Sequence, residues 1–410
     1  MKHVEGQRLI TLILLVILVF SLCGFAISGI FRSLFGFNVD FLPYYSAAQV
    51  FRQGGDMYDP DQIRQAELKN GLPRFEKIFS YQYPPLFTVL ILPFTFFKYS
   101  LAKVFWLALN QIFVIGALFF IWASVIKKRS FTEVAFFLFL ALNFYPLINN
   151  LNLGQINVLI LFLICGAFYF FKKGNDIYCG IFLGLAAMFR ITPALLIVYF
   201  LWRGQWRTFF WAVLSFVLLS LISLAIFGID IHCYYLTEFL PSYLSSVPNQ
   251  PANQSFTGFL FRLLDDGGLV DRVSAIFSFI SLILVAFYCR YKKGLSRDSL
   301  RYDLEFCLVI ITTLLISKVT WEHHLSWLLL PVAVVFWYFI ENKFEKSKTF
   351  LIVLTAVAYA FLSLQFDYTE PRLNQGLTAL AMAPRFYGAF ILWCVVLCLL
   401  RIVGFRRERG

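Results

Sequence analysis

"LITLILLVILVFSLCGFAISGIF", residues 9–31, contains no charged residue and follows a basic N-terminal stretch, residues 1–8. A membrane-spanning α-helix needs roughly 20 consecutive apolar residues. The apolar part of a cleaved signal peptide is shorter, about 7–15 residues. We therefore expect residues 9–30 to form an uncleaved transmembrane helix.

The rest of the chain repeats this pattern. Of the 410 residues, 60% are hydrophobic and 14% are charged, and the mean hydropathy is +0.75. Soluble domains carry about 45–50% apolar and about 25% charged residues. The composition therefore predicts an all-α polytopic membrane protein, and we expect residues 1–410 to form a single integral-membrane domain.

The net charge of +12 comes from short Lys and Arg clusters between apolar runs. This is the distribution of cytoplasmic loops under the positive-inside rule, so nucleic acid is not an expected partner. It predicts about ten full spans, two large outer loops at residues 31–83 and 229–271, and cytoplasmic termini. Residues 84–95 are short and proline-bounded, which favours a re-entrant or interfacial segment. The expected spans are 9–30, 101–126, 131–149, 155–171, 208–228, 272–289, 304–320, 325–340, 349–366 and 386–403, with a broken re-entrant hairpin at 177–202.

The first outer loop contains the segment "FNVDFLPYYSAAQVF", residues 37–51, whose one charge is Asp40. Helical spacing places Phe41, Tyr44, Tyr45 and Ala48 on one face, so residues 41–52 should form an amphipathic helix along the outer surface. Asp40 precedes this helix and could simply be its N-cap. It could also be a general base, held ionised by the same backbone N–H groups.

Arg190 lies in the broken apolar segment "AAMFRITPALL". A cation inside a membrane segment is usually paired or functional, and a helix break beside a cation suits a phosphate. The alternative is an arginine that extends its charged end from a short helix to the interface.

Polar side chains gather again in "SKVTWEHHLSWLLLP", residues 317–331. Imidazole and ammonium groups together favour contact with an anion such as phosphate. The HExxH spacing of a zinc site is absent. The alternative to an anion site is a polar turn between two helices, with Trp321 and Trp327 as anchors at the membrane interface. The candidate residues are Lys318, Glu322, His323 and His324.

Two further motifs supply neutral amides for hydrogen bonds to a sugar. Gln155 and Asn157 follow Gly154 at the start of a span, where capping a helix end is an equally good explanation. Asn253 and Gln254 lie in the second outer loop, before a Phe-rich turn.

The order of these motifs resembles that of glycosyltransferase family 87, membrane mannosyltransferases of the GT-C class. The motifs run from the Asp40 opening to the Trp-x-His-His turn and cover most of residues 9–340. They are Asp40–Tyr45, Tyr58–Pro60, Tyr83–Leu86, Gly154–Asn157, Arg190–Pro193, Asn253–Ser255 and Trp321–His324.

The resemblance implies a GT-C fold in the plasma (inner) membrane with an extracytoplasmic active site. It implies transfer of a hexose, mannose being expected, from a polyprenyl-phosphate donor to a lipid or glycan acceptor. Asp40 corresponds to the family's base, and His323 is the first match for a histidine near the donor phosphate. The position before Thr-Pro is commonly lysine in the family, whereas here it is Arg190.

We therefore expect an inverting single displacement without a cofactor. Asp40 and His323 are the catalytic candidates, and membrane lipids surround the site. A divalent metal held by Asp40 with Asp56 or Asp59 is a weaker alternative. The residues expected to bind the donor phosphate or the substrates are Arg190, Lys318, His324, Glu322, Tyr44, Gln155, Asn157, Asn253 and Gln254.

Two other functions fit a polytopic chain of this kind: a transporter or flippase of lipid-linked sugars, and a ligase that transfers a preassembled glycan. A transporter would usually show an internal repeat, which the sequence lacks. It also would not need its polar motifs concentrated at one membrane face. Incubation with one polyprenyl-phosphate hexose would distinguish glycosylation from translocation.

Overall fold

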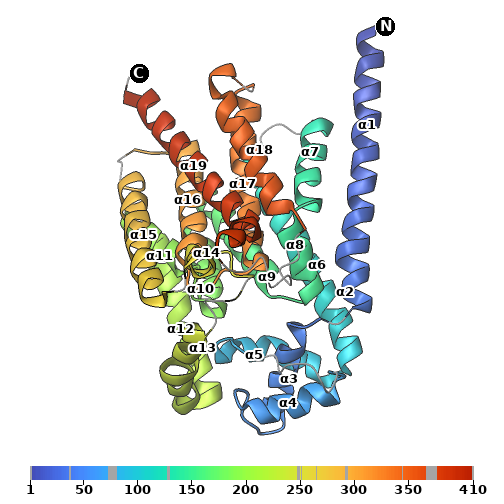
Figure 1. Ribbon diagram of the computed structural model, residues 1–410, viewed down its shortest axis with the longest axis vertical. Coiled ribbons are helices and arrows are strands. Elements are labelled where there is room, and N and C mark those ends of the chain that lie inside the picture. The colour runs from blue at the N-terminus through green and yellow to red at the C-terminus, as the bar shows by residue number, and fades with distance from the viewer. Residues whose placement is uncertain are drawn as a thin grey trace.

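The computed structural model describes residues 2–36, 38–72, 81–126, 130–246, 250, 252–264, 266–290, 294–343, 345–365 and 376–408. These residues form helices and connecting turns, and they contain no strand. Figure 1 shows a bundle of long helices with a smaller group, α3, α4 and α5, below it. The expectation of an all-α protein is confirmed.

The helices of the first half begin with α1 (Lys2–Phe25), continued by a π-helical turn (Ala26–Phe31) and α2 (Arg32–Phe35). The small group consists of α3 (Phe41–Arg52), α4 (Pro60–Lys69), α5 (Pro85–Ile91) and a 3₁₀ turn (Leu92–Phe96). Then follow α6 (Tyr99–Val125), α7 (Phe131–Leu142), α8 (Tyr145–Leu153), α9 (Asn157–Lys172), α10 (Asp176–Phe189) and α11 (Ala194–Trp202).

The second half begins with α12 (Trp206–Tyr234), a π-helical turn (Tyr235–Phe239) and α13 (Leu240–Ser246). The remaining α-helices are α14 (Phe256–Leu263), α15 (Gly267–Tyr288), α16 (Leu300–Ile316), α17 (Leu329–Glu341), α18 (Thr349–Ser363) and α19 (Pro384–Glu408). Three 3₁₀ segments accompany them: Glu322–Leu328, Lys346–Lys348 and Gly376–Met382.

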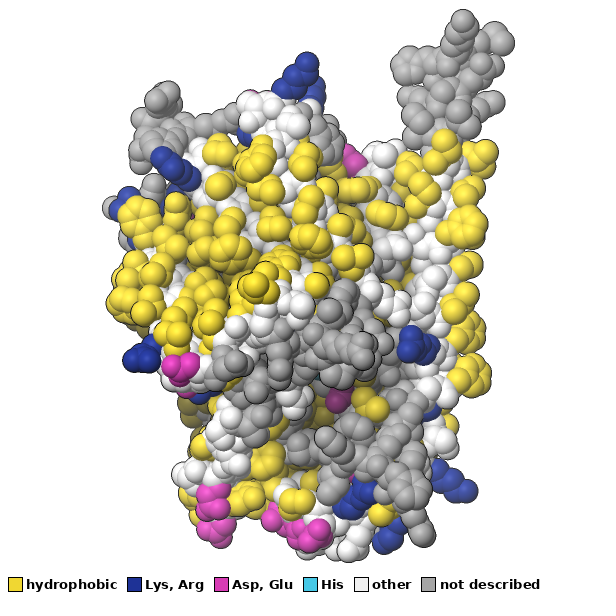
Figure 2. Space-filling view, in the orientation of Figure 1, with side chains coloured by type: hydrophobic (Ala, Val, Ile, Leu, Met, Phe, Trp, Pro, Cys, Tyr) yellow, Lys and Arg dark blue, Asp and Glu magenta, His cyan; other side chains and the backbone are white. Residues whose placement is uncertain are grey.

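Seven helical segments of the described chain are long and apolar enough to cross a membrane, and a bent pair, α7 with α8, makes an eighth. Two further expected spans coincide with α9 and α16, which have 16 and 17 residues. Figure 2 shows apolar side chains over α15, α18, α19 and α1, while charged side chains lie at the top and bottom of the view and near mid-height, at the lower end of α15. The protein is thus an integral membrane protein, and the number of ten crossings stays a prediction.

The two ends of the bundle differ. Both termini lie at one end, and α3, α4, α5 and α13 lie at the other (Figure 1). Much of residues 229–271, expected to be a loop, is helical, because α12 continues beyond a kink at Gly228 (φ 76°, ψ 170°). Only glycine adopts this conformation readily.

Helix α3 has the predicted bounds but not the predicted environment. Leu42, Ser46 and Ala47 are buried together with the apolar face, so the helix does not lie on the outer surface. It packs against α4, α5 and the Leu92–Phe96 turn. The periodic pattern identified one apolar face, but the small residues on the other side also allow close packing.

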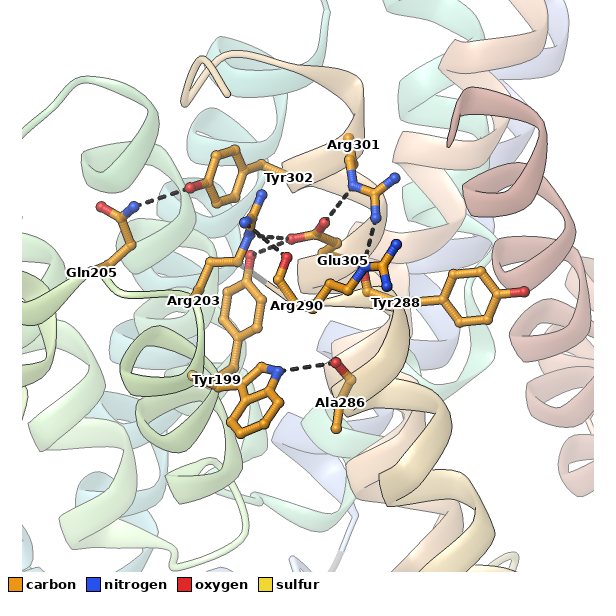
Figure 3. Close-up of polar contacts among 10 residues, drawn as sticks. Tyr199, Arg203, Gln205, Ala286, Tyr288, Arg290, Arg301, Tyr302 and Glu305 are labelled. Carbon is orange, nitrogen blue, oxygen red and sulfur yellow. Dashed lines mark hydrogen bonds and ion pairs between the residues drawn. The ribbon is translucent and has the colours of Figure 1, made fainter. Parts of the chain in front are cut away.

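A buried ion cluster joins the turn between α11 and α12 to α15 and α16 (Figure 3). Glu305 accepts from Arg203 Nε at 2.7 Å and from Arg301 Nε at 2.8 Å, and the side chains of Arg203 and Glu305 are fully buried. The same arginines donate to the carbonyl oxygens of Arg290 and Tyr288, at 3.1 and 2.8 Å. Tyr288 is the last residue of α15, so the donor from Arg301 satisfies a carbonyl group that has no partner within the helix.

Candidate functional site

The site begins where the end of α8 meets the start of α3. Gly154 ends α8 with φ +70°, and a Cβ atom there would lie 2.8 Å from Cβ of Phe41. The N–H of Asp40 donates to the carbonyl oxygen of Leu153 at 3.0 Å. This close approach brings Gln155, the next residue after Gly154, beside the Asp40 carboxyl group.

Three polar side chains converge on one atom of Gln155. Its Oε1 lies 2.9 Å from the hydroxyl of Tyr44, 3.0 Å from that of Tyr83 and 3.2 Å from Nδ2 of Asn157. Since all three can donate to this oxygen, they orient the amide. The NH₂ group of Gln155 is left for Asp40, with which it forms a side-chain hydrogen bond.

Asp40 occupies the N-cap position of α3, but its side chain accepts no capping hydrogen bond. The expectation that backbone N–H groups hold this carboxylate ionised is therefore wrong. Burial raises the pKa of Asp40 to about 6, and the hydrogen bond from Gln155 opposes that rise. A carboxyl group with this pKa is a competent proton acceptor near neutral pH.

Arg190 lies at the break between α10 and α11. Its backbone is extended (φ −154°, ψ 124°), and Pro193 follows before α11 begins. Nη1 of the half-buried side chain lies 3.4 Å from Oδ1 of Asn157. Burial raises the pKa of Tyr83 to about 12, while the charge of Arg190 lowers it and that of Asp40 raises it. Tyr83 therefore lies within the fields of both charges.

His324 approaches Arg190 from the Glu322–Leu328 segment. Its Nδ1 lies 3.1 Å from the backbone N of Trp321. Nε2 lies 2.6 Å from Nη2 of Arg190 and accepts from it, because a guanidinium group can only donate. His324 thus orients Arg190, whose remaining N–H groups can donate to an anionic oxygen.

His323 is also buried, and its Nε2 has no hydrogen-bond partner among the residues that the structure describes. Its ring centroid lies 4.6 Å from that of His324. Its backbone carbonyl accepts from Nδ2 of Asn150 at 2.6 Å, which fixes the turn against α8.

The other candidates of this segment lie away from Arg190. Glu322 forms an ion pair with Arg385 of α19 and accepts from Nδ2 of Asn149 at 2.9 Å. Lys318 is exposed, and its carbonyl oxygen accepts from Asn253. These contacts indicate that Glu322 positions the histidine turn; contact of Lys318 with a phosphate stays a prediction.

Asn253 and Gln254 lie just before α14 and make hydrogen bonds near the Trp321–His324 turn. Oδ1 of Asn253 accepts the N–H of Thr320 at 2.9 Å, and Oε1 of Gln254 accepts the N–H of Phe386 at 3.2 Å. Both side chains are almost completely buried. The structure gives these amides a positioning contact, and their contact with a sugar stays a prediction.

A cavity of about 280 Å³ opens beside Arg190 and Tyr83. Neither Asp40 nor the two histidines line it. Its walls combine a few polar groups with a larger apolar surface, which suits an amphiphilic ligand. The polar lining includes Gln82, Tyr83, Arg190, Ser220, His232 and Tyr243, and the apolar lining includes Met188, Phe216, Leu236, Leu240 and Leu244.

The sequence motifs pointed to only part of this wall. Tyr83 belongs to the "YPPL" motif, and this motif is the only sequence signal for its contact with Gln155. Tyr243 lies in an ordinary apolar stretch and carries no sequence signal. Among the described residues, no group of three or more His, Cys, Asp or Glu could hold a metal ion.

Comparison with known proteins identifies the family of this chain. The chain belongs to glycosyltransferase family 87, whose sequence profile matches residues 81–318. It is therefore a glycosyltransferase. Asp40 and the histidine turn lie on either side of the matched segment. No solved structure matches the chain.

The curated relatives include a protein of Mycobacterium tuberculosis named polyprenol-phosphate-mannose-dependent alpha-(1-2)-phosphatidylinositol mannoside mannosyltransferase. It is 24% identical over 339 residues, which are 78% of this chain and 75% of the relative. The protein of the same name from Mycolicibacterium smegmatis is 25% identical, covering 72% and 70%. A pentamannoside mannosyltransferase from M. smegmatis is 26% identical, covering 71% and 67%.

Proposed function

We propose that this protein transfers mannose from a polyprenyl-phosphate donor to a glycolipid or glycan acceptor by a single inverting displacement. A GT-C fold of about ten spans would carry the site at the extracytoplasmic membrane face. The observation that carries the proposal is the continuous polar chain from Asp40 through Gln155 and Asn157 to Arg190 and His324.

In this mechanism Asp40 removes the proton of the acceptor hydroxyl as its oxygen attacks the anomeric carbon. The bond between that carbon and the donor phosphate oxygen breaks, and the phosphate leaves with an additional negative charge. The guanidinium group of Arg190, oriented by Nε2 of His324, donates to this phosphate. The Nε2 of His323, whose ring lies beside that of His324, is a further candidate hydrogen-bond donor.

The cavity beside Arg190 supports binding of the donor's lipid. Its apolar wall from α10, α12 and α13 suits a polyprenyl chain, and the phosphate would lie at the Arg190 end. The relatives named above use phosphatidylinositol mannosides. A phosphatidylinositol mannoside is therefore the acceptor class that we propose.

The test is the Asp40→Asn substitution in the purified full-length protein, assayed with polyprenyl-phosphate mannose and phosphatidylinositol dimannoside. Loss of a general base lowers turnover by about 10²–10⁴-fold. The folded protein should retain its Tm near pH 4, where the carboxyl group of Asp40 is protonated in the folded state and makes no capping hydrogen bond.

Asp59→Asn is the matched control. Asp59 caps α4 with its side chain and lies outside the polar chain, so this variant should keep normal turnover. Normal turnover of Asp40→Asn, or equal losses in both variants, would contradict the role of Asp40.

A further inference from the structure

A second cavity, of about 540 Å³, lies on the other side of α3 from Gln155. Tyr44 faces Gln155, whereas its neighbour Tyr45 lines this cavity and donates to the carbonyl oxygen of Phe97 at 2.7 Å. The cavity is formed between the ends of α3 and α4 and the start of α6. Its polar lining includes Gln49, Lys69, Asn70, Lys98, Tyr99 and Ser100.

The charged side chains that line this second cavity are lysines, while the buried carboxyl group of Glu67 lies near Tyr99 behind the wall. Lys69 and Lys98 line it, and neither ammonium group has a carboxylate partner in the part of the chain that the structure describes. No acidic side chain is among the described residues of its lining. The guanidinium group of Arg52 lies nearby, 4.9 Å from the ring centroid of Phe96. Such a pocket suits a phosphate bound together with hydroxyl groups.

Apolar side chains border the same cavity. Phe96 and Phe97 are 75% and 43% exposed, and Leu101 and Phe105 on the first turns of α6 are also exposed. In an integral membrane protein, exposed aromatic residues beside lysines are typical of the interface where lipid headgroups lie. Acyl chains could therefore cover the phenylalanines while the headgroup enters the cavity.

The wall of the second cavity also reaches the segment that carries Asp40. The ring of Tyr99 stacks on Phe41 with centroids 5.9 Å apart, and its hydroxyl lies 3.4 Å from the carbonyl oxygen of Asn38. A headgroup in the cavity is therefore separated from Asp40 only by the first turn of α3.

We propose that this second cavity binds the phosphate and inositol of the glycolipid acceptor, with Lys69 and Lys98 contacting the phosphate. The acceptor's sugar chain then extends past Tyr99 and the start of α3 to Asp40. This inference rests on the proposed function, and it separates the acceptor, on one side of α3, from the donor lipid beside Arg190.

The experiment compares Lys69→Gln/Lys98→Gln with the unchanged protein, using phosphatidylinositol dimannoside and the neutral octyl α-mannoside as acceptors. Loss of two cationic contacts should raise KM for the phosphorylated acceptor by about tenfold or more. The kcat value, the KM for the donor and the KM for octyl mannoside should not change. Lys69→Arg/Lys98→Arg should restore the original KM.

Arg272→Gln is the matched control, since Arg272 is an exposed cation on α15 outside both cavities. It should leave every constant unchanged. The proposal is overturned if the double variant leaves the KM for the phosphorylated acceptor unchanged, or raises both acceptor KM values equally. The second result would indicate a structural effect.

A binding measurement separates this proposal from the proposed function. Native mass spectrometry of the full chain should show retention of phosphatidylinositol over phosphatidylcholine, and the double variant should lose this preference. Soluble inositol 1-phosphate should bind more weakly than the lipid; equal affinity would contradict a lipid ligand. If no acceptor is mannosylated, the proposed function fails, while the preference for phosphatidylinositol still decides the ligand of the second cavity.

Discussion

Gln155 receives three polar side chains at its Oε1 and offers its NH₂ group to Asp40. A carboxylate stabilised by several donors would have a low pKa and would be a poor base. With one side-chain donor and little solvent, Asp40 instead has a pKa of about 6. The orientation of a single amide thus helps to set the basicity of the site.

The activity should therefore depend on the ionisation of Asp40. We expect kcat/KM to fall as the pH is lowered through about 6, because the protonated carboxyl group cannot accept the acceptor's proton. Gln155→Leu removes the hydrogen bond that lowers this pKa, so the acidic limb of its pH–rate profile should move to higher pH. A profile that stays flat through this range in the unchanged protein would contradict the assignment.

The pH dependence of stability tests the same pKa of Asp40 without an activity assay. The folded-state pKa of Asp40 is raised from 3.8 to about 6, so folding disfavours the charged form. The contribution of Asp40 to the free energy of unfolding is most favourable below the pKa of 3.8 that it has in the unfolded chain. This contribution is lost as the pH rises through about 6, its pKa in the folded protein. Asp40→Asn should accordingly raise Tm, relative to the unchanged protein, above pH 6 and not near pH 4.

The junction between α8 and α9 holds Asp40 in place. Gly154 has a positive φ and lies against Phe41, so α8 can approach the start of α3 more closely than any side chain at that position would allow. The geometry of Asp40 therefore depends on a helix end far away in the sequence.

Gly154→Ala should abolish most of the activity, because the added Cβ would push Phe41 and the Asp40 segment away from Gln155. Gly174→Ala is the matched control: its φ is +76°, but no atom lies within 4 Å of the added Cβ. Both variants should lose about 1 kcal/mol of stability from backbone strain. Equal turnover in the two variants would show that the contact with Phe41 is unimportant.

The ion cluster around Glu305 stabilises the opposite end of the bundle. Glu305→Ala leaves Arg203 and Arg301 buried without their carboxylate, and we expect a loss of about 3–5 kcal/mol. Asp298→Ala, which removes the 66%-exposed partner of Lys172, should cost no more than about 1 kcal/mol. Denaturant unfolding in detergent would measure both, and similar losses would contradict the importance of the buried cluster.

The arrangement of the whole chain can be tested by labelling. Both termini lie at one end of the bundle and the Asp40 segment lies at the other (Figure 1). In a background without the native cysteines, Gln53→Cys should react with a membrane-impermeant maleimide in intact cells. Lys173→Cys should react only after permeabilisation. The reverse pattern would place the site on the cytoplasmic side.

Local patterns predicted local structure well. Pro193 predicted the break after Arg190, and the three- and four-residue spacing predicted the bounds of α3. The same spacing could not show what covers the other face of α3, since that depends on α4 and α5. The family's motifs predict that Asp40 converges with His323, whereas the contacts connect Asp40 to His324 through Gln155, Asn157 and Arg190. No local signal in the sequence joins Gln155 to Tyr83 or Arg203 to Glu305.

The pair formed by Arg203 and Glu305 has a consequence for how the chain is made. Glu305 is synthesised 102 residues after Arg203. Before Glu305 is translated, the guanidinium group of Arg203 has no carboxylate partner. Arg203 therefore has to remain hydrated at the membrane surface during this time. The hairpin of α10 and α11, and with it the corner that carries Arg190, can reach its final depth only after α16 has been inserted. The side of the protein that carries Arg190 is thus completed late in translation, although most of its residues are made early.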